Sequence, residues 1–95
     1  MKFENFFLIY HCLGQEFTDV KNVRVELEMI YKREQEVIIF TDADGKTKKY
    51  PLDDIAEIVT SRNRYDFRAR GTSAEFLDLF RDSNVGAIRS ITTKG

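Results

Sequence analysis

The chain has 95 residues, a formal net charge of -1, 42% hydrophobic residues and 33% charged residues. This length suits one domain that buries a core without metal or disulfide staples. The composition excludes disordered, collagenous and membrane-spanning classes, so we expect a single domain over residues 1–95.

The first apolar run, FFLIYHCL at 6–13, contains the only cysteine, Cys12. A single cysteine excludes an internal disulfide and favours a reducing compartment. The run is interrupted by His11 and is too short to span a bilayer. We therefore expect a cytoplasmic protein without membrane contact.

Two strands are expected next to each other in the chain. Residues 6–12 are apolar on both alternating faces, which is typical of a strand covered on both sides. NVRVELEMIYKR at 22–33 alternates cleanly, as a half-buried strand does. Its inward set is Val23, Val25, Leu27, Met29 and Tyr31, and its outward set is Arg24, Glu26, Glu28 and Lys32.

A hairpin is expected after a turn at 33–35. EVIIFT at 36–41 forms its first strand, and DADGK at 42–46 forms the loop, with Gly45 at the position of positive φ. The returning strand at 46–50 is rich in lysine, which indicates a protected sheet edge, and Pro51 ends it.

Residues 51–61 have two interpretations. As a helix, Leu52, Ile55, Ala56 and Val59 form an apolar stripe and Asp53 and Asp54 lie near the N-terminus. We favour the alternative, a short turn at 51–54 followed by a strand, and keep a second short helix at 51–60 as the other option.

SRNRYDFRARG at 61–71 places four arginines and two aromatic residues in eleven positions. If the stretch is extended, Arg62, Arg64, Arg68 and Arg70 point to one side and Tyr65 and Phe67 to the other, and we expect its strand at 64–70. A helix is predicted from 72 to 83, with Thr72 and Glu75 as a capping box and Asn84 as its end. Residues 87–92 can add a terminal strand.

The predicted fold class is α+β: a mostly antiparallel sheet or partly open roll of five to six strands, with one C-terminal helix at about 72–83. One helix cannot cover both faces of such a sheet. The second face is expected to curl into a barrel, to take the helix at 51–60, or to pair with another subunit as a homodimer.

The residue inventory indicates no enzyme. His11 and Cys12 are the only residues of their types, and neighbours in a strand point to opposite faces. DADG does not fit a calcium loop, because Phe40 and Pro51 would occupy ligand positions that need carboxylates. We expect no cofactor and no metal.

Binding surfaces remain. Residues 61–95 carry 7 Lys/Arg against 4 Asp/Glu, a net +3, whereas residues 1–60 carry 8 against 12, a net -4. The arginines at 62, 64, 68 and 70 are a solvated strand face, or a surface that binds carboxylates or phosphates. Glu26 and Glu28 form a second candidate surface, which is acidic. Each set also has the plain interpretation of charges that face water.

We therefore expect protein–protein recognition, in a regulatory or inhibitory role, through Arg62, Arg64, Arg68, Arg70, Glu26 and Glu28. The inhibitory role rests on class analogy alone, with small phage inhibitors and antidotes that present carboxylates to a basic groove. The alternative is a nucleic-acid-binding module that uses the 62–70 strand, but Asp66 and a pI near 5.8 weigh against it.

Overall fold

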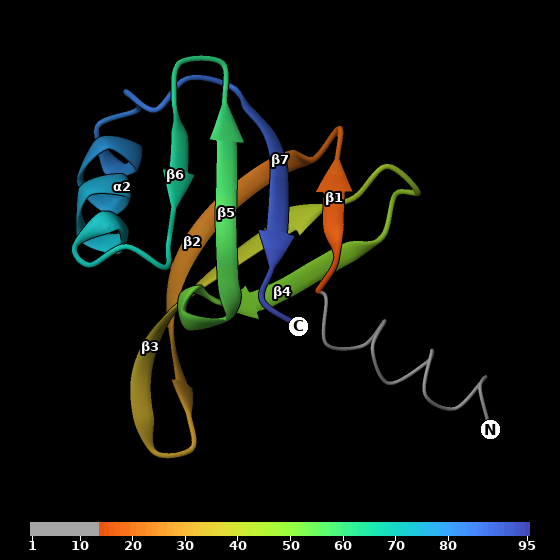
Figure 1. The fold of residues 1–95 in the computed structure, drawn as a ribbon. Coiled ribbons are helices and arrows are strands. Elements are labelled where there is room, and N and C mark those ends of the chain that lie inside the picture. Colours follow the sequence, from red (N-terminus) through yellow and green to blue (C-terminus); the bar gives the residue numbers. More distant parts are fainter. Residues whose placement is uncertain (1–13) are drawn as a thin grey trace, which may run out of the picture.

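In the part of the chain that the structure describes, two antiparallel sheets and one α-helix form the fold (Figure 1). The computed structural model describes residues 14–95, so the strand predicted at 6–12 lies outside it, as do His11 and Cys12. The first sheet has the order β1-β7-β5-β6 and the second has the order β2-β3-β4. The strands are β1 (Glu16–Thr18), β2 (Lys21–Ile30), β3 (Arg33–Thr41), β4 (Thr47–Pro51), β5 (Ile55–Thr60), β6 (Arg64–Asp66) and β7 (Ile88–Thr93). The predicted α+β class is confirmed.

The core lies between the inner faces of the two sheets. Ile58 of β5 and Ile91 of β7 are directly opposite each other, and neither is exposed to solvent. From the second sheet, Ile38 and Phe40 of β3 join the same cluster. The helix α2 (Thr72–Arg81) adds Phe76, which is fully buried. Each sheet thus covers one apolar face of the other.

The hairpin between β3 and β4 forms as predicted. The carboxylate of Asp42 accepts hydrogen bonds from the backbone N–H groups of Asp44 and Lys46, both at 2.9 Å, and Gly45 takes the left-handed conformation with φ 82°. An aspartate that binds the backbone two residues ahead stabilises such a turn. The strand β4 is outermost in its sheet, so its lysines do lie at an edge.

The preferred interpretation of residues 51–61 is confirmed. A single 3-10 turn, η1 (Leu52–Asp54), follows Pro51, and β5 begins at Ile55. A helix over 51–60 is therefore wrong beyond that turn. Strand pairing favours the strand over the helix here, because β5 lies between β6 and β7 and its backbone is hydrogen-bonded on both sides.

The predicted helix is confirmed and begins at Thr72 as predicted, but it ends at Arg81 and its caps differ from the prediction. Its N-cap is Gly71 with φ 85°, no side chain caps it, and Thr72 already lies inside the helix, so the predicted capping box is wrong. At the other end Ser83, not Asn84, is left-handed with φ 58°. The N–H of Asn84 donates to the carbonyl of Leu79 at 2.8 Å, which is the main bond of a Schellman motif.

The turn after β2 is Tyr31–Lys32, two residues before the predicted one at 33–35. Both residues have positive φ, 52° and 64°, as in a type I′ turn. Such turns usually contain Asn or Gly, and neither occurs here, so the residue types do not mark it. As a result β3 begins at Arg33 and pairs with β2 along its length.

Candidate functional site

The predicted arginine strand is shorter in the structure than in the prediction. Only Arg64–Asp66 is extended, as β6, and a turn over 67–70 leads to the helix. The segregation of side chains nevertheless holds: Tyr65 and Phe67 are 3% and 8% exposed, whereas Arg64 and Arg68 face solvent. The two rings pack on Phe76 with centroids at 5.3 and 5.4 Å. Their faces are therefore not accessible to stacking bases.

Two of the four arginines line one groove. This groove, of about 280 Å³, lies on the outer face of the first sheet and is lined by Glu57, Arg64, Arg68, Thr92 and Lys94, among others. Arg64 forms an ion pair with Glu57, the pairing across the sheet that the solvated interpretation expects. The groove thus holds three cationic groups, of which Arg64 is paired with Glu57 of the groove and Arg68 is paired with Asp66.

The other two arginines lie elsewhere. Arg62 is in the turn between β5 and β6, where its Nη1 donates to the carbonyl of Asn84 at 3.1 Å and links that turn to the segment after α2. Arg70 lies in the turn before α2 and is exposed. The sequence-predicted set of arginines is therefore spread over both ends of β6.

Asp66 holds the turn that ends β6. Its Oδ1 accepts the backbone N–H of Arg68 at 3.0 Å and the Nε of Arg68 at 3.1 Å. The backbone hydrogen bond first, then the side chain of Arg68, lowers the pKa of the Asp66 carboxyl. The stabilisation from this ionised group is present above the ordinary aspartate pKa and is lost as pH falls through the lowered value.

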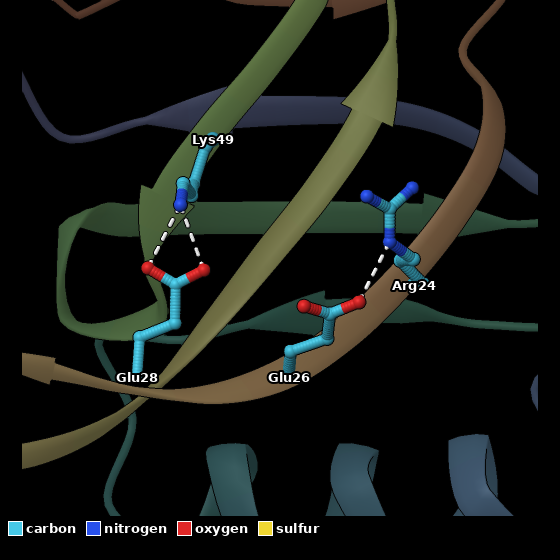
Figure 2. Close-up of polar contacts among 4 residues, drawn as sticks. All are labelled: Arg24, Glu26, Glu28 and Lys49. Atoms are coloured by element: carbon cyan, nitrogen blue, oxygen red, sulfur yellow. Dashed lines mark hydrogen bonds and ion pairs between the residues drawn. The ribbon is translucent and has the colours of Figure 1, made fainter.

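The predicted acidic surface lies on the second sheet, away from the groove. Figure 2 shows that both glutamates are paired: Glu26 with Arg24 at 2.8 Å, and Glu28 with Lys49 at 2.7 Å. The second pair joins β2 to β4 across the central strand, above fully buried Val37. These carboxylates thus neutralise neighbouring cations and shield an apolar strand.

A third surface was not predicted. The β2–β3 hairpin extends beyond the other sheet and the helix (Figure 1). We call its outer half, residues 27–36, the arm. Leu27, Met29 and Tyr31 are 59%, 67% and 94% exposed there, although the alternation of β2 predicts them to be inward. That prediction is correct for Val23 and Val25, which pack on the core, and wrong for these three.

The pairing of β2 with β3 explains why the face of β2 that is covered at Val23 and Val25 is exposed from Leu27 onward. Leu27 is opposite Glu36, and Met29 is opposite Glu34, so carboxylates share the face of these apolar side chains. Glu36 pairs with Arg81 at the end of α2, at 2.7 Å. The arm therefore begins where the helix stops covering the sheet. Placing the turn at 31–32 would have revealed these acidic neighbours from the sequence.

Metal-binding groups, membrane-spanning helices and similar proteins add no functional assignment. Among residues 14–95 no group of three or more His, Cys, Asp or Glu side chains is arranged to hold a metal ion. In the same range no helix is long and apolar enough to cross a membrane. No family model, no curated protein and no solved structure matches the chain.

Proposed function

We propose that this protein acts by binding another protein through the arm, in a regulatory or inhibitory role. The observation that supports the proposal is the exposure of Leu27 and Met29 on one face of the arm and of Tyr31 in its turn. Large apolar side chains that gather on a surface are typical of protein interfaces, and Tyr and Met are enriched in them.

The arm suits a protein partner better than a nucleic acid. Its apolar face is bordered by Glu34 and Glu36; Glu36 is paired with Arg81, and the charge of Glu34 repels phosphates. On the other sheet, Glu57 and Asp66 pair with the two groove arginines, and the nearby aromatic rings are buried. The groove residues Arg64 and Arg68 stay in the proposal as a secondary contact for a partner that carries carboxylates.

The test is capture of partners from a lysate of the source cells on the immobilised protein. The Met29→Lys/Tyr31→Lys double variant places charge on the apolar face, and we expect capture to fall about tenfold or more, as for interface hot spots. Because both side chains are mostly exposed, the free energy of unfolding should change by less than about 1 kcal/mol.

The matched control is Glu75→Lys, which raises the net charge by the same amount on the exposed side of α2. Its capture should equal that of the wild type. Equal capture by the double variant and the wild type would show that the arm is not the binding surface.

A further inference from the structure

We propose that β2 pairs, antiparallel, with β2 of a second copy of this chain, so that the arm joins two molecules into one continuous sheet. This inference rests on the proposed function and names the partner of the same surface. It comes from the free hydrogen-bonding edge of β2 and from the order of charges along it.

The free backbone groups of β2 lie at its odd-numbered residues. In a hairpin with a two-residue turn, the pair that closes the turn, here Ile30 and Arg33, exchanges both backbone hydrogen bonds. Even-numbered residues from 24 to 30 therefore bond to β3. The N–H group of Asp42 donates to the carbonyl of Lys46, so the backbone groups of the even-numbered residues of β3 bond to β4 and those of its odd-numbered residues bond to β2. This agrees with the assignment from the turn. The N–H and C=O groups of Val25, Leu27 and Met29 thus point away from β3.

From Arg24 to Ile30 this edge lacks the short length, the lysines and the proline that protect the other outer strands, and its bulge lies before Arg24. Among residues 14–95, β2 is the longest strand at a sheet edge, with ten residues, whereas β1 and β6 have three each. The edge strand β4 carries Lys48 and Lys49 and ends at a proline. Lysines and prolines at an edge prevent pairing with other molecules. On β2 the residues at the free edge are apolar instead, and two of them, Leu27 and Met29, are exposed.

The charges of β2 select one register. When Val25 lies opposite Val25 of the second copy, Arg24 lies opposite Glu26 of that copy, and the symmetry repeats this pair. The next register, with Val25 opposite Leu27, would bring the two Glu26 side chains together. These even-numbered positions are the closer, non-hydrogen-bonded pairs of such a ladder. Each Glu28 already contacts Lys49, and each Arg24 already contacts Glu26. The dimer would therefore join Arg24 and Glu26 of both copies in one cluster of alternating charges on its outer face, with the apolar side chains on the inner one.

Two single-charge reversals test this register. In Arg24→Glu, residues 24 and 26 are both acidic, and in Glu26→Arg both are basic, so each variant repels itself in the proposed pairing. Mixed together, the two variants place opposite charges at both contacts. In sedimentation equilibrium at about 100 μM, where a dimer of micromolar Kd is nearly complete, we expect doubled mass for the wild type and for the mixture. We expect monomers for either variant alone.

Hydrogen exchange gives a readout that needs no variant. The amides of Val25 and Leu27 should exchange slowly in concentrated solution and at least tenfold faster on dilution, whereas the amide of Glu26, which bonds to β3, should keep its rate. A monomeric wild type, dimers of either variant alone, or a mixture that fails to associate would overturn the self-pairing. A monomeric wild type would leave the lysate capture and its loss in Met29→Lys/Tyr31→Lys as they are, so the proposed function would be judged separately.

Discussion

Tyr65 holds a polar group inside an apolar core. Its hydroxyl oxygen is buried and has no hydrogen-bond partner among residues 14–95. A hydroxyl that loses water without gaining a partner destabilises the folded state by about 1–3 kcal/mol. We expect Tyr65→Phe to keep the edge-to-face contact with Phe76 and to raise the free energy of unfolding by about 1 kcal/mol, as measured by urea denaturation.

The control for this substitution is Tyr31→Phe, which removes the same hydroxyl from a side chain that is 94% exposed. Its free energy of unfolding should equal that of the wild type. A loss of stability in Tyr65→Phe would mean that the hydroxyl is bonded in solution, and the packing of β6 on the helix would need a different account.

At the scale of elements, the start of α2 depends on the backbone of Gly71 and not on a capping side chain. Gly71 has φ 85°, and a Cβ added there meets no atom within 4 Å, so only the left-handed conformation disfavours a side chain. We expect Gly71→Ala to lower the free energy of unfolding by about 1 kcal/mol. Thr72→Ala should change it by less than about 0.5 kcal/mol, because Thr72 caps nothing. Thermal unfolding of the two variants gives the comparison. If Thr72→Ala were more destabilising than Gly71→Ala, the predicted capping box would be correct.

The elements that could be predicted from the sequence are those whose signal is local. The helix follows from the apolar spacing of its residues, and the β3–β4 turn follows from Asp42 and Gly45, whose chemistry favours a tight turn. The short strand β1 was not predicted. Three residues carry too little pattern, and β1 exists because Phe17 pairs with Ile91, far along the chain.

The candidate site was less predictable, because it depends on long-range register. Alternation in β2 identifies which side chains share a face, but not where the cover over that face ends. That limit is set by Arg81 on Glu36 and by the position of the Tyr31–Lys32 turn, and neither is visible in local composition. The arginines show the same limit, since their spacing predicts one face, but the turn after Asp66 separates Arg70 from it.

At the scale of the whole molecule, the protein consists of a body and an arm. Both faces of β3 are buried from Val37 to Phe40, and β2 contributes Val23 and Val25 to the core. Beyond Leu27 and Glu36 no side chain of the hairpin belongs to the described core cluster. An exposed apolar extension adds little to folding, and such extensions are typical of the kind of binding surface that we propose.

This division predicts that the outer part of the arm can be removed without unfolding the body. Replacing Met29–Glu34 with Asn-Gly joins Glu28 directly to a new type I′ turn before Gln35. The register pairs Glu28 with Gln35 in the same hydrogen-bonding phase as Ile30 with Arg33, the pair that closes the natural turn, so a two-residue loop fits there.

The shortened protein keeps the Glu28–Lys49 pair over Val37 and the Glu36–Arg81 pair at the helix. We expect one cooperative transition in urea, with a free energy of unfolding within about 1 kcal/mol of the wild type. A loss above about 3 kcal/mol would show that the arm is part of the folding core, because only interior side chains destabilise by that amount when they are removed.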